Sequence, residues 1–125
     1  DFASIVSPQM FDEFILPSLA QQMEHADRNI FHMDGRGVAK NIDRILELPR
    51  LDAIQWAQGI GSDRPILQWV PLIKKIQAAG KSVIVDIAPD ELEDFIGSVR
   101  PEGIYLWIAA DPGTEEAIIR RTESW

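Results

Sequence analysis

Hydrophobic and polar residues alternate along the chain with two different periods. Stretches with a period of two residues, rich in β-branched and aromatic side chains, predict strands. These stretches occupy residues 29–35, 53–59, 82–88 and 103–109. Between them, apolar residues recur every three or four positions, which predicts helices before, between and after the strands. Strands that alternate with helices are typical of an α/β fold with parallel strands.

Proline, glycine and small polar residues mark where several of the predicted helices begin and end. Ser7 followed by Pro8 is typical of a helix start, because the serine can cap the first turn. Pro17 lies inside the first helical pattern and should kink the helix or split it in two. Pro71 is expected to restart the third helix, and Gly80 to cap its end.

Apolar stripes predict the remaining helices. The second helix is predicted from the stripe of Val38, Ile42, Ile45 and Leu46, and it should end near Pro49. A short acidic-to-apolar helix is predicted over residues 90–99, and a last helix after the turn at residues 111–114.

Alternate residues of each predicted strand form one strongly apolar face, whereas the other face carries polar or amphipathic side chains. This second face includes His32, Asp34, Gln55, Asp86, Tyr105 and Trp107. An open doubly wound sheet is covered by helices on both faces, so its strands should be apolar on both. A (β/α)8 barrel has helices on one face only, and its active site lies at the carboxyl ends of the strands. Asp34, Gln55 or Gln58, and Asp86 fall at these ends.

The alternation therefore predicts an α/β fold of four βα units with parallel strands, the C-terminal half of a (β/α)8 TIM barrel. We interpret residues 1–125 as a single domain, and an open flavodoxin-like sheet is the alternative. Half a barrel leaves two strand edges unpaired. We expect a missing N-terminal half-barrel, or self-association through these edges, to cover them.

Composition excludes several classes of partner. The 125 residues are 46% hydrophobic, which suits one globular domain with its own core. A net charge of −8 disfavours binding to nucleic acid or to an anionic membrane surface. No run approaches the roughly 18 apolar residues of a membrane span. With no cysteine, the chain has neither disulfides nor thiolate ligands, and we expect a cytoplasmic protein.

Four segments carry a resemblance to a known family. SPQMFDEFILPSLAQQM, FHMDG, LDAIQW and PLIKKIQAAGKSVIV resemble the C-terminal half of the uroporphyrinogen decarboxylase-like superfamily. That superfamily includes uroporphyrinogen decarboxylase and the cobalamin-dependent (corrinoid) methyltransferases. The resemblance implies a (β/α)8 barrel without its N-terminal half and a small-molecule substrate, which is a porphyrinogen in the decarboxylase branch. The activity implied is that of a lyase or a methyltransferase.

The chain departs from both branches of this family. In the methyltransferases, zinc is bound by a histidine, by a cysteine two residues later and by a further cysteine. His32 matches the first ligand, but Asp34 stands at the position of the cysteine. The decarboxylases need no cofactor, and their key arginine and aspartate come mainly from the half-barrel missing here. We therefore expect the fragment itself to be inactive, and a non-catalytic barrel that binds a small molecule is the alternative.

The strongest candidates for catalysis are His32, Asp34 and Asp86, which share the open face of the predicted sheet. His32 and Asp34 are a candidate acid–base pair or, in a zinc-dependent protein, a metal-binding pair. The alternative for His32 is a hydrogen bond to a neighbour, and for Asp34 a cap on the next helix. Asp86 interrupts an apolar strand, so it needs a partner, which would be structural if Asp86 has no catalytic role.

Further residues are candidates for holding a substrate. Gln55 and Tyr105 lie on the open face and could orient it, and Arg36 could meet an anionic group. The segment DGRGVAK contains Gly-x-Gly but lacks the third glycine of a dinucleotide site. We interpret Trp56 and Trp107 as packing residues.

Overall fold

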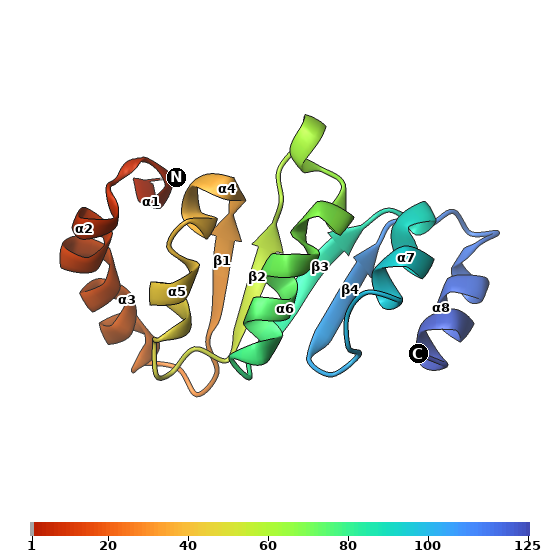
Figure 1. Ribbon diagram of the computed structural model, residues 1–125. Coiled ribbons are helices and arrows are strands. Elements are labelled where there is room, and N and C mark those ends of the chain that lie inside the picture. The colour runs from red at the N-terminus through yellow and green to blue at the C-terminus, as the bar shows by residue number, and fades with distance from the viewer. Residues whose placement is uncertain (1) are drawn as a thin grey trace.

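The computed structural model describes residues 2–125, and in this part of the chain four parallel strands form one sheet (Figure 1). The strands are β1 (Ile30–Asp34), β2 (Ala53–Ala57), β3 (Ser82–Ile87) and β4 (Ile104–Ile108). They lie side by side in chain order, and each neighbouring pair is parallel. The prediction of an α/β fold with four parallel strands is confirmed.

Helices precede, connect and follow the strands. The helical elements are α1 (Phe2–Ile5), α2 (Pro8–Met10), the π-helical η1 (Phe11–Ile15), α3 (Leu16–Met23), α4 (Gly35–Ala39), α5 (Ile42–Leu46), the 3-10 turns η2 (Gly61–Asp63) and η3 (Ile66–Trp69), α6 (Val70–Ala78), the 3-10 turn η4 (Pro89–Glu91), α7 (Leu92–Ile96) and α8 (Glu115–Glu123). Within residues 2–125, none of these helices has the length and apolar character needed to cross a membrane.

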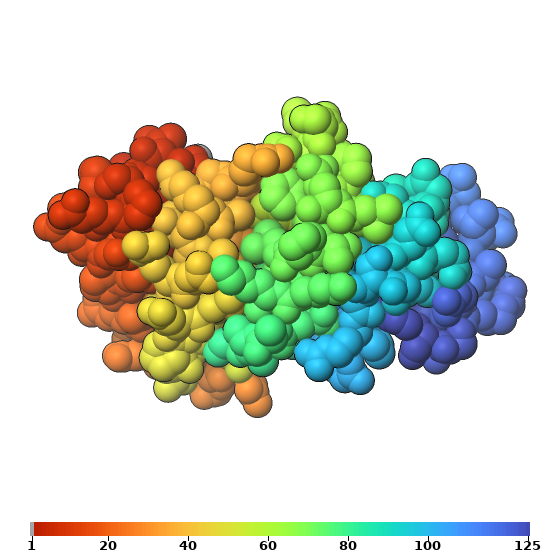
Figure 2. Space-filling model, viewed as in Figure 1, coloured from red at the N-terminus to blue at the C-terminus, as the bar shows by residue number. Residues whose placement is uncertain are grey.

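The order of the strands distinguishes between the two predicted architectures. A doubly wound sheet reverses its strand order at a switch point and carries helices on both faces. Here the order β1-β2-β3-β4 does not reverse, and the helices lie in front of the sheet in Figure 1. Figure 2 shows the segments following one another across this face, from the N-terminal helices to α8. The flavodoxin-like alternative is therefore not the fold of residues 2–125.

The first predicted helix is divided at Pro17. The Ser7 hydroxyl accepts a hydrogen bond from the N–H of Met10 at 3.2 Å, so the predicted cap is confirmed. Pro17 has no N–H, and its ring would clash with the preceding turn of a regular α-helix. The chain avoids this clash by forming η1, in which the N–H of Leu16 bonds the carbonyl of Phe11, five residues earlier. The predicted split therefore takes the form of a π-helical turn.

The segment over residues 38–46, predicted as one helix, is two short helices, α4 and α5. Between them Asn41 has φ −99° and ψ 13°, outside helical geometry. Lys40 at the break donates to the carbonyl oxygens of Ser4 and Val6 at 3.1 Å each, which holds the N-terminal helices against α4. Both helices keep the predicted apolar stripe on the core side, so periodicity alone does not reveal the break.

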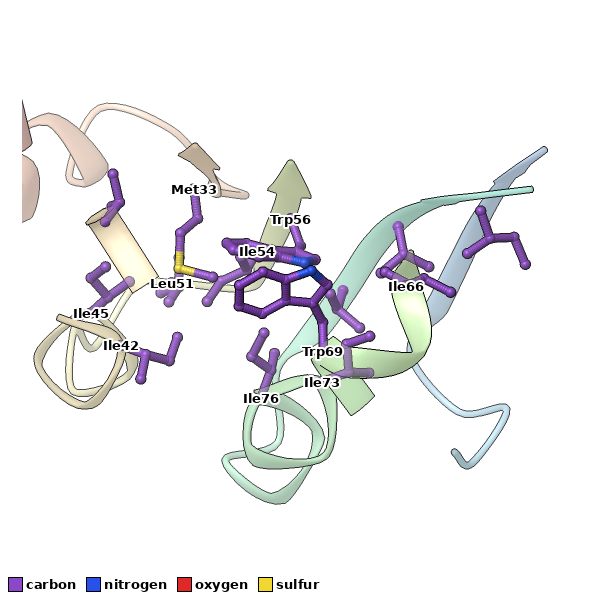
Figure 3. Close-up of a cluster of buried hydrophobic side chains, with 14 of the residues drawn as sticks. Met33, Ile42, Ile45, Leu51, Ile54, Trp56, Ile66, Trp69, Ile73 and Ile76 are labelled. Carbon is purple, nitrogen blue, oxygen red and sulfur yellow. The ribbon is translucent and has the colours of Figure 1, made fainter. Parts of the chain in front are cut away.

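The core lies between the sheet and the helices that cover it. The helix-facing residues of β2 and β3 are at most 1% exposed; they are Ile54, Trp56, Val83, Val85 and Ile87. They belong to one cluster with apolar side chains of α5 and α6. Figure 3 shows Ile54 and Trp56 of this cluster beside Ile45 of α5 and Ile73 and Ile76 of α6. Trp56 contacts Trp69 edge-on, with ring centroids 4.7 Å apart, so the prediction that Trp56 packs in the core is confirmed.

Asp52 aligns the beginnings of the first three strands. One carboxylate oxygen accepts from the backbone N–H of Asn29 at 2.8 Å, and the other from Arg28 at 2.9 Å. The carbonyl of Asp52 accepts from the N–H of Ser82 at 3.0 Å. The bond from Asn29, followed by that from Arg28, holds the pKa of Asp52 below its ordinary value, because both favour the charged carboxylate.

The lowered pKa of Asp52 predicts a dependence of stability on pH. Because the folded pKa lies below the unfolded one, Asp52 stabilises the fold fully above about pH 5 and loses this effect as pH falls through the folded pKa. Urea denaturation of wild type and Asp52→Asn should therefore show a difference in unfolding free energy that shrinks on acidification. Asp27→Asn, an exposed neighbour, is the control and should follow the wild type at each pH. A difference that stays constant down to about pH 2 would contradict the role given to Asp52.

Candidate functional site

The face of the sheet opposite the helices carries one row of side chains at the same level. In the register of the sheet, His32 lies opposite Gln55, Gln55 opposite Ile84, and Ile84 opposite Tyr105. At the carboxyl ends of the strands this face opens into a cavity of about 310 Å³. Its polar lining consists of His32, Asp34, Gln55, Gln58, Arg64 and Asp86. Three predicted catalytic residues and one predicted substrate-binding residue therefore meet at one cavity.

His32 and Gln55 form a hydrogen-bonded pair across β1 and β2. The distance from His32 Nδ1 to Gln55 Oε1 is 3.0 Å. An amide oxygen only accepts hydrogen bonds, so in this pair Nδ1 carries the proton. The lone pair of Nε2 is then free to accept a proton or to bind a cation. The hydrogen bond expected for His32 as an alternative is thus present, and it leaves the second ring nitrogen available.

Asp34 brings a carboxylate to the cavity at the end of β1. It occupies the N-cap position of α4, but its side chain makes no capping bond. The capping role considered from the sequence is therefore wrong. The chain turns directly after Asp34 through Gly35, whose φ of +75° suits glycine. Among residues 2–125 the Asp34 carboxylate has no hydrogen-bond or ion-pair partner, so it remains available to a ligand.

Asp86, at the end of β3, has the partner that its position in an apolar strand requires. Its carboxylate accepts from the Arg64 guanidinium at 2.8 and 3.5 Å. Both side chains are partly exposed, Arg64 to 49% and Asp86 to 38%. The ion pair therefore lies at the surface of the cavity, where either member can meet a ligand.

Gln58 holds the loop that carries Arg64. Its Nε2 donates to the carbonyl of Asp86 at 2.7 Å and to the carbonyl of Arg64 at 3.1 Å. Only 2% of Gln58 is exposed, so this amide is a structural link between the loop after β2 and the end of β3. Sequence reasoning missed Arg64, although the segment IGSDRP directly follows a predicted strand, where barrel enzymes place functional loops.

Two predicted substrate-binding residues lie elsewhere. Arg36 does not line the cavity; it pairs with Asp63 at 2.7 Å and stacks on the Trp69 ring at 5.0 Å. These contacts join the loops after β1 and β2. Tyr105 is 65% exposed and lines a separate groove between β4 and α8.

Trp107 was interpreted as a packing residue, and that interpretation is wrong. It lies on the open face of β4, is 62% exposed and lines the cavity. Alternation along β4 placed it on this face, but the size and apolar character of tryptophan suggested burial. Its indole gives the cavity a flat aromatic wall on which a planar ligand can stack.

The donors at the cavity do not complete a metal site. Within residues 2–125 there is no group of three or more His, Cys, Asp or Glu side chains placed to hold a metal ion. His32 and Asp34 would supply two ligands, whereas a catalytic zinc ion takes three from its protein.

Comparisons with known proteins give no assignment. The chain matches no protein-family model, no curated protein and no solved structure.

The His32–Gln55 pair predicts the tautomer of the imidazole. In the neutral ring, nitrogen-15 correlation spectra should show the proton on Nδ1. In Gln55→Leu the acceptor is lost, and the proton should move to Nε2. Because both side chains lie on the open face, the unfolding free energy should change by less than about 0.5 kcal/mol. A proton on Nε2 in the wild type would show that the two side chains do not pair as described.

Proposed function

We propose that the chain is half of a uroporphyrinogen decarboxylase-like (β/α)8 barrel whose cavity binds a small organic molecule. The sequential parallel sheet, covered by helices on one face, supports this architecture. The position of the cavity supports it further, since barrel enzymes bind their substrates at the carboxyl ends of the strands. The family in this proposal rests on the resemblance of four sequence segments.

The observation that carries the proposal is the set of side chains meeting at the cavity. His32 can exchange a proton through Nε2, and Asp34 brings a free carboxylate to the same strand end. Arg64 can hold an anionic group of a ligand, and Trp107 offers a flat surface for a ring. Decarboxylation requires these functions, because an acid must be held and the carbon that loses carbon dioxide must be protonated.

A metal-independent reaction suits the cavity better than zinc-dependent methyl transfer. The methyltransferases use two thiolates and a histidine, and this chain has no cysteine. Among residues 2–125, no three His, Asp or Glu side chains are placed to hold a metal ion together, whereas a catalytic zinc ion takes three protein ligands. We therefore favour a decarboxylase-like site. A barrel that only binds its ligand would share the cavity but not the proton transfer.

Binding of a carboxylated tetrapyrrole tests the proposal. Titration with coproporphyrin III should quench tryptophan fluorescence saturably, because Trp56 and Trp107 both line the cavity, and Trp107→Phe should reduce the quenching without removing it. His32→Ala should raise the Kd at least about tenfold, or about 1.4 kcal/mol, with little change in stability. His25→Ala is the matched control, since the other histidine of the chain is exposed and lies before β1. Equal affinity in all of these variants would refute the proposed cavity.

The zinc content of the purified chain distinguishes a decarboxylase-like site, which needs no metal, from a methyltransferase-like site, which binds zinc. Mass spectrometry of the purified chain should find no stoichiometric zinc, because no three donor side chains among residues 2–125 are placed to hold a metal ion together. One zinc ion per chain, lost in His32→Ala and kept in His25→Ala, would contradict the metal-independent site and favour a methyltransferase-like one.

A further inference from the structure

Ile60 is the most exposed large hydrophobic side chain of residues 2–125, with 90% of its surface open to solvent. It lies in the loop after β2, directly before η2, and it lines the cavity that holds His32 and Arg64. Figure 1 shows this loop, in light green, extending past the carboxyl ends of the strands. Single exposed isoleucines are common on protein surfaces, but this one stands at the edge of the proposed ligand site.

The backbone on either side of Ile60 can change conformation readily. Gly59 has φ +100° and Gly61 has φ +61°, which glycine adopts without strain. A Cβ atom added to Gly61 would meet nothing within 4 Å, and one added to Gly59 would meet only the Cβ of Asp63 at 3.8 Å. Within residues 2–125, neither the N–H of Gly59 nor that of Ile60 forms a hydrogen bond. Neither packing nor hydrogen bonding therefore fixes this short segment.

The rest of the loop is held in place by side chains. Three of them donate to consecutive carbonyl oxygens: Gln68 to Ser62 at 2.8 Å, Trp69 to Asp63 at 2.8 Å and Gln58 to Arg64 at 3.1 Å. The carbonyl of Ile60 accepts only from the N–H of Asp63, at 3.3 Å. Movement is therefore confined to residues 59–61, and Arg64 keeps its place beside Asp86 while Ile60 moves.

We propose that Ile60 is a specificity-determining residue, which folds over the cavity and packs on an apolar ring or chain of the bound ligand. This inference rests on the proposed ligand cavity. Arg64 takes an acidic group, and Trp107 and Ile60 contact the apolar part of the same molecule. The ligand class is therefore an organic acid that carries an apolar ring or chain next to its charged group.

Closure of Ile60 over the ligand also strengthens the electrostatic contacts of the site. Arg64 and Asp86 are 49% and 38% exposed in the free chain, so water weakens their interaction with other charges. An isoleucine above the ligand excludes part of this water, and the guanidinium then holds the acidic group more tightly. A small acid without an apolar group offers Ile60 no surface to pack on, so it gains nothing from closure.

Naphthalene-1-sulfonate is the probe that tests the inference, because it joins an anionic group to an apolar ring. The titration is followed through the indole N–H resonance of Trp107, which lines this cavity. Ile60→Ser should raise the Kd at least about fivefold, since the apolar contact is lost, and Ile60→Val should restore most of the affinity. Because Ile60 is exposed in the free chain, the urea midpoint of both variants should equal that of the wild type.

Two controls separate this contact from a general effect. Ile5→Ser replaces an isoleucine that is 78% exposed on α1 and is not part of the cavity lining, so it should bind the probe as the wild type does. Methanesulfonate has the acidic group without the ring, and it should bind with the same Kd to the wild type and to Ile60→Ser.

The contact itself is measured in the saturated complex. Nuclear Overhauser effects should connect the methyl groups of Ile60 with the ring protons of the naphthalene, and the order parameter of these methyl groups should rise. An unchanged Kd in Ile60→Ser, an equal loss of affinity for both sulfonates, or a bound probe without contact to Ile60 would overturn the inference. Failure of the naphthalene probe to bind would overturn it as well.

Failure of the proposed decarboxylase-like function gives a different pattern. Coproporphyrin III would then not bind, whereas naphthalene-1-sulfonate would still bind and contact Ile60. In that case the role of Ile60 stands, and the ligand is a smaller acid than a tetrapyrrole.

Discussion

Helices confined to one face of a parallel sheet are the constraint on which the rest of this structure depends. Parallel strands in sequential order are joined by crossovers of one hand, which place every connecting helix on the same side. The side chains on the helix-facing side of each strand must then be apolar and close-packed, whereas those on the open face need not be. The row from His32 to Tyr105 lies on this open face. Polar side chains can stand there because that face is not part of the core.

This constraint explains which parts of the molecule were predictable from the sequence. Strand parity depends only on alternation along a few residues, so the open-face positions of His32, Gln55 and Asp86 were predictable. The division of the first helix at Pro17 was also predictable, because its cause is local. The break between α4 and α5 was not, since the apolar stripe continues across it.

The remaining errors concern contacts made through loops. Arg64 reaches Asp86 because Gln58 holds the loop after β2 in place, and this bond joins residues 28 positions apart. Arg36 does not reach the cavity because it forms an ion pair with Asp63, which lies on that same loop. Loop conformations of this kind have no periodic signal in the sequence. Trp107 was misjudged for a different reason: residue type favoured burial, but at an edge strand no segment of residues 2–125 lies over it.

The strands of this sheet tolerate changes in length poorly, because one register places four side chains next to one another on the open face: His32, Gln55, Ile84 and Tyr105. Inserting or deleting one residue within a strand would move every later side chain of that strand to the opposite face. Isoleucines and valines of the core would then face solvent, and the imidazole or carboxylate would be buried. Insertions between Gly59 and Pro65, by contrast, leave all four strands in register. Lineages of this fold can therefore vary the loop that carries Arg64 in length, while the strands must change by substitution alone.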